Sequence, residues 1–202
     1  MTTTMPEVSS WNLANYLTLL RLALVPVFLV LLLGRGGEDE GFRIGAAVVF
    51  ALASYTDRVD GQIARSRGLV TSFGKLMDPI ADKALTGAAL IGLSLLAELP
   101  WWVTVVVLVR EVGVTLLRLF VIRHGVMPAS RGGKLKTLLQ GLALGLYLLP
   151  LTGLAASTRA PVMALAVLVT VVTGVDYVIR AVTLRQTSER AVMKRARRAA
   201  RS

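Results

Sequence analysis

The 202-residue chain is 54% hydrophobic, has a mean hydropathy of +0.66, carries a formal net charge of +11 and contains no cysteine. A soluble domain of this length would expose too many apolar residues, so the composition argues against one and predicts long apolar helices. The lack of cysteine excludes disulfides, thiolate metal sites and a cysteine nucleophile. The sequence has no base-reading motif, so we expect the positive charge to meet anionic membrane lipid and not nucleic acid.

Six apolar segments follow one another along the chain, each near the ~20 residues that a helix needs to cross a membrane. We expect them at about 13–33, from 44 into the Asp57 region, and at about 73–96, 100–122, 135–156 and 161–183. The sequence therefore predicts an all-α integral membrane protein with six transmembrane helices. A six-helix domain at 13–183 would lie between an N-terminal cytoplasmic segment (1–12) and a basic cytoplasmic tail (184–202).

The distribution of basic residues predicts the orientation of these helices. The breaks after the second and fourth segments hold three and four basic residues, and the C-terminal segment holds eight more. The opposite breaks hold only Arg35, Arg43 and Arg159. Because basic residues are enriched on the cytoplasmic side, we expect both termini to face the cytoplasm. The bias toward Ala, Arg, Leu and Val is compatible with a bacterial source, so the expected location is the bacterial cell (inner) membrane.

Four aspartates gather at the predicted cytoplasmic ends of the second and third helices. Asp57 and Asp60 are spaced i,i+3, and Asp78 and Asp82 are spaced i,i+4, so each pair faces one way on its helix. Carboxylate oxygens are the ligands that Mg²⁺ and Mn²⁺ prefer. Two such ions ~3.5–4 Å apart can hold the attacking and leaving oxygens of a phosphoryl-type displacement. The cluster therefore predicts a site for two divalent cations at the cytoplasmic surface.

The residues that follow Asp60 fit a phosphorylated ligand. Gly61 and Ala64 are small enough to let a bulky ligand approach the helix backbone, and Arg65 can bind a phosphate through two hydrogen bonds. Solvated acids at a helix end are the simpler explanation, but they leave these neighbours unexplained. Two other functions stay open, namely a cation transporter that uses the aspartates as ligands and a non-catalytic membrane scaffold.

The aspartate pattern resembles the signature of the CDP-alcohol phosphotransferase family. It reads Asp57-x-x-Asp60-Gly61-x-x-Ala64-Arg65, then eight residues, then Gly74-x-x-x-Asp78-x-x-x-Asp82. The resemblance extends over about 12–182 through the segments NYLTLLRLALVP (15–26), REVGVTLLR (110–118) and GGKLKTLLQ (132–140). It implies a six-helix membrane enzyme, dependent on divalent metal, that acts as a homodimer. The three segments imply transfer of a phosphatidyl group from CDP-diacylglycerol to glycerol 3-phosphate, with release of CMP.

The resemblance also implies a role for several residues. Asp57, Asp60 and Asp78 would be metal ligands, and Asp82 would be the catalytic proton acceptor that can also contact a metal. Gly61, Arg65 and Thr71 fall where the family binds the CDP-linked donor. Asn15 and Thr18 are further candidates for the donor head group, unless they only cap and pack their helix.

A phosphorylated acceptor needs a second set of cations. The candidates lie on the fourth and fifth helices, and they are Arg110, Arg118, Arg131, Lys134 and Lys136. For the last three, ordinary cytoplasmic topology is an equally good explanation. Glu111 follows Arg110, but adjacent side chains point apart on a helix, so we expect the partner of Arg110 on another helix or the substrate. Inositol phosphate, serine and phosphatidylglycerol remain alternative acceptors.

Two further pairs concern packing. Asp176 is expected to form a structural ion pair with Arg180, four residues later, or with Arg21. Gly141 and Gly145, also four apart, would permit the close helix packing of a homodimer.

Overall fold

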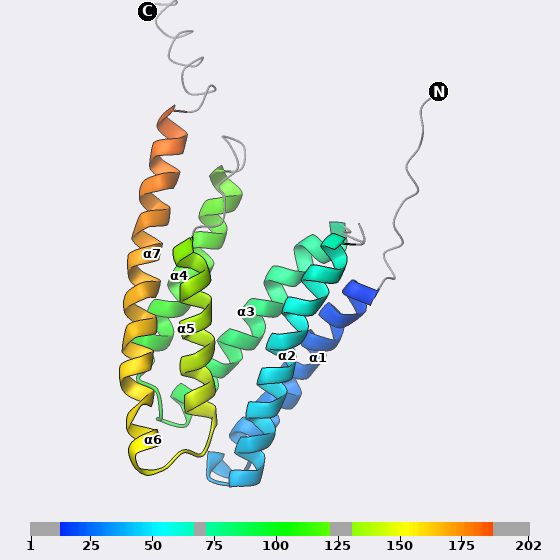
Figure 1. The fold of residues 1–202 in the computed structure, drawn as a ribbon, viewed down its shortest axis with the longest axis vertical. Helices are drawn as coiled ribbons and strands as arrows, with labels where there is room; N and C mark the ends of the chain where they lie inside the picture. Colours follow the sequence, from blue (N-terminus) through cyan, green and yellow to red (C-terminus); the bar gives the residue numbers. More distant parts are fainter. Residues whose placement is uncertain (1–12, 67–71, 122–130, 188–202) are drawn as a thin grey trace, which may run out of the picture. The chain divides into compact units, whose positions relative to one another are not determined.

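The computed structural model describes residues 13–66, 72–121 and 131–187, and all the regular structure in these ranges is helical. Six helices have 18 residues or more, as Figure 1 shows. The elements are α1 (Leu13–Leu33), the 3₁₀ turn η1 (Gly34–Gly37), α2 (Glu40–Ser66), α3 (Ser72–Leu95), α4 (Trp101–Val121), α5 (Arg131–Leu148), the short α6 (Gly153–Ser157) and α7 (Arg159–Thr187).

Each of the six long helices overlaps one of the six predicted apolar segments, so the prediction of an all-α fold is confirmed within the described ranges. The largest difference concerns the fifth segment, expected at 135–156. Its helix, α5, begins at Arg131 and ends at Leu148. The residue before a proline avoids the helical conformation, so Pro150 stops the helix and a separate short helix, α6, follows.

The turn between α1 and α2 follows from its local sequence. The backbone of Arg35, Gly36 and Gly37 adopts positive φ angles of 51°, 71° and 75°, a region that glycine enters without steric cost. The carboxylate of Asp39 then accepts a hydrogen bond of 3.0 Å from the backbone N–H of Phe42. Because the first N–H groups of a helix lack partners, this bond caps the start of α2.

The helices divide into two compact units. The first unit contains α1, η1, α2 and α3 together with the segment Leu144–Thr152. In it α1 packs against both α2 and α3. The rings of Phe28 and Phe50 join α1 to α2 with a centroid distance of 5.9 Å. A Cβ on Gly92 of α3 would lie 2.6 Å from a methyl group of Leu32, so any larger residue would require this side chain to shift.

A buried arginine ties the far end of the first unit together. Arg43 of α2 is 5% exposed and donates hydrogen bonds to both carboxylate oxygens of Glu98. It also donates to the carbonyl oxygens of Gly37, Tyr147 and Leu148. The last two belong to the final turn of α5, where carbonyl groups have no partner inside the helix. We call Arg43, Glu98 and these three carbonyl groups the Arg43 cluster.

The second unit contains α4, α6, α7 and the part of α5 up to Ala143. In this unit α4 packs against α7. Its buried apolar side chains include Val107 and Val114 of α4 and Met163 and Ala166 of α7. These residues recur at helical spacing, so each helix turns one apolar face toward the other.

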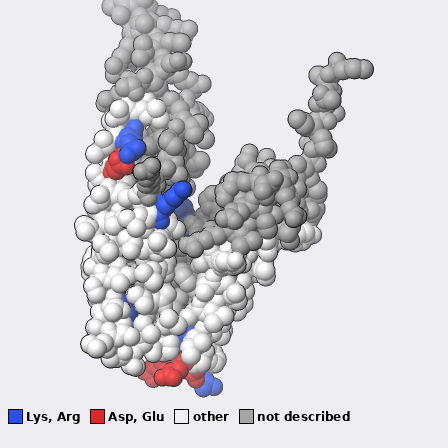
Figure 2. Space-filling view, viewed as in Figure 1, with Lys and Arg blue, Asp and Glu red and all other residues white. Residues whose placement is uncertain are grey.

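Much of the described surface is apolar. Large apolar side chains are exposed along the long helices, for example Val30 (68%), Leu52 (58%), Val109 (66%) and Leu168 (60%). In Figure 2 most described atoms in view are uncharged, and acidic side chains gather at the lower end beside the start of α2. Two segments of the described chain, Tyr16–Gly37 and Gly153–Leu184, are long and apolar enough to cross a membrane by length and composition.

Candidate active site

The four aspartates lie on the two helices where the sequence places them. Asp57 and Asp60 belong to the C-terminal half of α2, and Asp78 and Asp82 to the N-terminal half of α3. Their side chains lie outside the described part of the chain, so the metal-ligand and base assignments stay predictions. Among the side chains that are described, no group of three His, Cys, Asp or Glu residues could hold a metal ion.

The residues predicted to bind the donor are described only in part. Gly61, Ala64 and Arg65 lie on α2 with side chains outside the described set, as does Asn15 on α1, and Thr71 lies between the described ranges. Thr18 is the exception, because its side chain is 2% exposed on α1.

A buried polar face of α1 lies at the level of the aspartate-bearing half of α2. Thr18 and Arg21, 2% and 1% exposed, are one turn apart on this face. Phe28 contacts Phe50, and α1 and α2 run in opposite directions. Arg21 precedes Phe28 by seven residues, and Asp57 follows Phe50 by seven. Because both helices rise equally per residue, Arg21 and Asp57 occupy the same level of the unit.

The contact between α1 and α3 leads to the same level. These helices run in the same direction, and the side chain of Leu32 lies against Gly92. Arg21 precedes Leu32 by eleven residues, and Asp82 precedes Gly92 by ten. The backbone register therefore places a buried arginine at the height of both aspartate-bearing segments.

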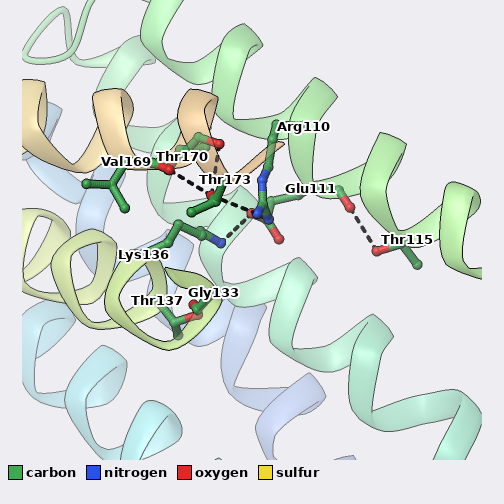
Figure 3. Close-up of polar contacts among 9 residues, drawn as sticks. All are labelled: Arg110, Glu111, Thr115, Gly133, Lys136, Thr137, Val169, Thr170 and Thr173. Carbon is green, nitrogen blue, oxygen red and sulfur yellow. Dashed lines mark hydrogen bonds and ion pairs between the residues drawn. The ribbon is translucent and has the colours of Figure 1, made fainter. Parts of the chain in front are cut away.

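A second polar cluster in the other unit joins two of the predicted acceptor-binding residues. Figure 3 shows the side chains of Arg110, Glu111, Lys136 and Thr173 converging from α4, α5 and α7. Nη1 of Arg110 lies 3.2 Å from a carboxylate oxygen of Glu111, which also accepts a hydrogen bond from Nζ of Lys136. Nη2 of Arg110 donates to the hydroxyl of Thr173 at 3.0 Å. We call these four residues the Arg110 cluster.

The Arg110 cluster is largely shielded from solvent. The side chains of Arg110 and Glu111 are each 13% exposed, and that of Lys136 is 7% exposed. Nε of Arg110 is buried and has no hydrogen-bond partner among the described residues. The three ionised groups carry a formal net charge of +1. A shielded site with a positive charge and an unused N–H donor is suited to bind an anion.

The expectation about Glu111 is partly wrong. Adjacent Cβ atoms do point apart on a helix, and we therefore expected no contact between Arg110 and Glu111. Both side chains are long enough to bend back toward each other, and the observed distance is 3.2 Å. The expected partner on another helix is also present, because Thr173 of α7 contacts Arg110.

The other three residues predicted to bind the acceptor phosphate have no described contact with the Arg110 cluster. Lys134 is exposed on α5, and the side chains of Arg118 and Arg131 lie outside the described set. Asp176 does pair with Arg180, at 2.8 and 2.9 Å, as one of the two expected alternatives. Both partners of that pair are well exposed, so it contributes little to stability.

Sequence reasoning missed the contribution of α7 to the Arg110 cluster. Thr173 binds Arg110, and a Cβ added to the next residue, Gly174, would lie 3.1 Å from Cγ of Arg110. The stem of the arginine therefore runs along the backbone of α7, where an added Cβ would make a tight contact with it. A Thr-Gly pair inside an apolar segment gives no sign of this role, because small residues there usually serve packing alone.

Comparison with known proteins places the chain in one protein family. Residues 11–172 match the family model described as CDP-alcohol phosphatidyltransferase. The chain is 60% identical over 170 residues to a protein of Mycobacterium tuberculosis named "Probable phosphatidylglycerophosphate synthase", covering 84% of this chain and 81% of that protein. It is 40% identical over 180 residues to the "CDP-diacylglycerol--glycerol-3-phosphate 3-phosphatidyltransferase" of Bacillus subtilis, covering 83% and 93%.

A more distant relative carries a different name. The "Cardiolipin synthase (CMP-forming)" of Streptomyces coelicolor is 37% identical over 120 residues, covering 58% of this chain and 54% of that protein. All three names describe transferases of phospholipid synthesis, which supports an enzyme over a cation transporter or a scaffold. The family match covers the aspartate-bearing helices and, of the Arg110 cluster, Arg110, Glu111 and Lys136. The chain belongs to the CDP-alcohol phosphatidyltransferase family.

Proposed function

We propose that this protein transfers the phosphatidyl group of CDP-diacylglycerol to glycerol 3-phosphate, giving phosphatidylglycerophosphate and CMP. The observation that carries the proposal is the 60% identity, over most of both chains, to the mycobacterial protein named "Probable phosphatidylglycerophosphate synthase". The Bacillus relative, whose name states the same reaction, supports it. The Arg110 cluster adds a physical reason, because a shielded site with a net positive charge suits an acceptor that is itself a phosphate ester.

The aspartates are proposed to hold the metal ions and to supply the base. Four carboxylates with no thiol or imidazole among them are a donor set that fits hard divalent cations such as Mg²⁺ or Mn²⁺. When bound, two such ions would neutralise the donor pyrophosphate and the departing CMP. Asp57, Asp60 and Asp78 would be the ligands. The same level of α1 carries Thr18, which would contact the donor head group.

The proton transfer is assigned to Asp82. Its carboxylate accepts the proton of the primary hydroxyl of glycerol 3-phosphate, whose oxygen then forms a bond to the lipid-side phosphorus. The bond from that phosphorus to the CMP oxygen breaks. A carboxylate is a weak base for an alcohol, so most of the acceleration must come from the position of the acceptor and the charge around it. Arg110 and Lys136 would fix that position by binding the acceptor phosphate.

We further propose that the six long helices span the membrane with both termini in the cytoplasm. The apolar side chains exposed along these helices would then face lipid, and Trp101 and Trp102, both more than half exposed, would lie at an interface. The membrane would be the bacterial cell membrane, with the aspartates at its cytoplasmic face. A homodimer is part of the proposal, and Gly141 and Gly145, which meet nothing within 4 Å in the single chain, would leave room for it.

The test is release of CMP by the purified protein with CDP-diacylglycerol, Mg²⁺ or Mn²⁺, and one acceptor at a time. We expect release with glycerol 3-phosphate and none with serine. Asp82→Asn should abolish release while the protein stays folded, and Asp176→Asn, an exposed acid in an ion pair, is the matched control that should keep it. Near-normal turnover of Asp82→Asn would remove Asp82 from the role of base.

A second candidate differs only in the acceptor. The Streptomyces relative is named as a CMP-forming cardiolipin synthase, and that product requires phosphatidylglycerol as the acceptor. Release of CMP with phosphatidylglycerol, and none with glycerol 3-phosphate, would favour this candidate over the first.

A further inference from the structure

We propose that Glu111 is a positioning residue for the acceptor phosphate. In this inference, which rests on the proposed function, its carboxylate holds Arg110 and Lys136 in the geometry that grips the phosphate. Sequence reasoning gave Glu111 no role, and the structure places it between the two cations. It is one of two described glutamates that pair with a largely buried arginine.

The first step of the argument is repulsion. Arg110 and Lys136 come from different helices, and their charged ends approach the same carboxylate. Two like charges a few ångströms apart repel strongly where water is largely excluded, and these side chains are 13% and 7% exposed. Without an anion between them, this repulsion would drive the two charged ends apart. Glu111 therefore keeps both in place while the acceptor is absent.

The second step concerns what remains available once Glu111 is bound. The carboxylate compensates one of the two positive charges, so the three groups keep a net charge of +1. Arg110 uses Nη1 for Glu111 and Nη2 for Thr173, while its buried Nε has no partner among the described residues. The guanidinium is thus fixed from two sides and still has donor capacity. An arginine held in this way loses less side-chain freedom when it binds a phosphate.

The third step separates this role from a simple charge effect. If Glu111 acted only through its negative charge, it would repel the acceptor, and removing that charge would strengthen binding. If Glu111 acts by positioning, removing its charge frees the two cations and weakens binding. The two roles therefore predict opposite changes in the KM for glycerol 3-phosphate.

The experiment uses the purified full-length protein with saturating CDP-diacylglycerol and Mg²⁺, and it varies glycerol 3-phosphate. We expect Glu111→Gln to raise the KM for glycerol 3-phosphate about tenfold or more, with the KM for CDP-diacylglycerol unchanged. Glu111→Asp keeps the charge on a shorter side chain, so it should raise the same KM about threefold. The matched control is Glu98→Gln, the same change in the Arg43 cluster, which should leave both KM values unchanged.

The outcomes are distinguishable. An unchanged or lower KM for glycerol 3-phosphate in Glu111→Gln would overturn the positioning role and leave the proposed function standing. If that variant does not fold, Glu111→Asp decides by the same criterion. If the unaltered protein releases no CMP with glycerol 3-phosphate, the proposed function fails. Titration with inorganic phosphate in the absence of donor then still tests Glu111, because weaker phosphate binding by Glu111→Asp is expected only from positioning.

Discussion

The two units each contain a largely buried arginine beside a glutamate, yet the two clusters have different consequences. Arg43 donates to one carboxylate and to three backbone carbonyl oxygens, so its donors are used within the fold. Arg110 and Lys136 instead share one carboxylate, and Nε of Arg110 has no described partner. Counted over the ionised groups named here, the first cluster is neutral and the second has a formal charge of +1.

This difference gives a criterion for distinguishing charged clusters that stabilise the fold from charged clusters that bind substrate. A buried ion pair whose donors and acceptors are matched holds elements together, and its loss should appear as lost stability. A cluster with surplus charge and an unused donor is not optimised for stability alone, so its loss should appear in substrate binding. The following predictions test whether the Arg43 cluster and the Arg110 cluster divide in this way.

The largest expected effect is the loss of stability in Arg43→Met. The change leaves the carboxylate of Glu98 without this cation and removes one hydrogen bond from each of three backbone carbonyl groups, two of them at the end of α5. Breaking a buried pair by removing one partner costs about 3–5 kcal/mol. We expect a clearly lower midpoint of thermal unfolding in detergent, measured by circular dichroism.

The control for that variant is Arg35→Met, in the same unit. Arg35 is 71% exposed. It pairs with Asp39 and lies 5.4 Å from the centroid of the Phe42 ring, and such exposed contacts are weak, so its loss should shift the unfolding midpoint little. Equal shifts for the two variants would mean that the Arg43 cluster is no more structural than an exposed pair.

The fold was largely predictable, because its signals are local. Runs of about twenty apolar residues bounded by charges and prolines specified six helices, and all six exist within the described ranges. The boundary of α5 was missed because the apolar run continues past Pro150, and hydrophobicity alone does not register the backbone restriction that proline imposes.

Residues of the candidate site that lie close together on one helix could be identified from the sequence. Contacts between residues of different helices could not. The aspartate pattern and the basic residues on α4 and α5 could be read from one helix at a time. The contact between Arg110 and Thr173 joins residues 63 positions apart, and no periodicity encodes it. The level of Arg21 likewise follows only from the contacts of α1 with α2 and α3.

The next largest effect is expected from Arg110→Gln. Hydrogen bonds to charged groups contribute about 1.5–3 kcal/mol, so the KM for glycerol 3-phosphate should rise about 10- to 100-fold. The unfolding midpoint should change less than in Arg43→Met, because Arg110 binds one carboxylate and one hydroxyl instead of three backbone carbonyl groups. Initial-rate measurements at saturating CDP-diacylglycerol give the KM, and an unchanged value would remove Arg110 from the acceptor site.

A smaller effect is expected from Gly174→Ala, which changes no charge. The added Cβ would lie 3.1 Å from Cγ of Arg110, so the arginine stem has to move by a few tenths of an ångström. Because the guanidinium moves with the stem, the KM for glycerol 3-phosphate should rise several-fold. Gly113→Ala on α4 is the matched control, since nothing lies within 4 Å of its added Cβ. Equal KM values in the two variants would show that the position of Arg110 tolerates this displacement.

Removal of one hydroxyl should have a still smaller effect. Thr173→Val keeps the shape of the side chain and removes the 3.0 Å hydrogen bond to Arg110. A hydrogen bond of this kind contributes about 1 kcal/mol, which corresponds to a two- to fivefold rise in the KM for glycerol 3-phosphate. The same substitution at Thr183, an exposed residue of α7 whose hydroxyl donates to Ile179, is the control. A rise in both variants would point to α7 as a whole and not to this bond.

The smallest effect concerns the exposed turn beside the Arg43 cluster. The backbone N–H of Phe42, helped by the Arg35 guanidinium, holds the pKa of the Asp39 carboxyl below its usual value of 3.8. Because the pKa is lower in the folded than in the unfolded protein, the charge of Asp39 stabilises the fold above about pH 3.8. That contribution is lost as the pH falls below 3.8 toward the folded-state pKa.

Asp39→Asn isolates this charge, because asparagine can still cap α2. The unfolding midpoint of the variant should lie slightly below that of the unaltered protein at pH 6, and the difference should vanish as the pH falls below 3.8. A difference that stays constant down to pH 3 would mean that the carboxylate charge is not its source. The change in unfolding midpoint should be much smaller than that of Arg43→Met, because the charge of Asp39 is screened by solvent and the partners of Arg43 lie inside the fold. Equal changes would contradict the distinction between the exposed turn and the Arg43 cluster.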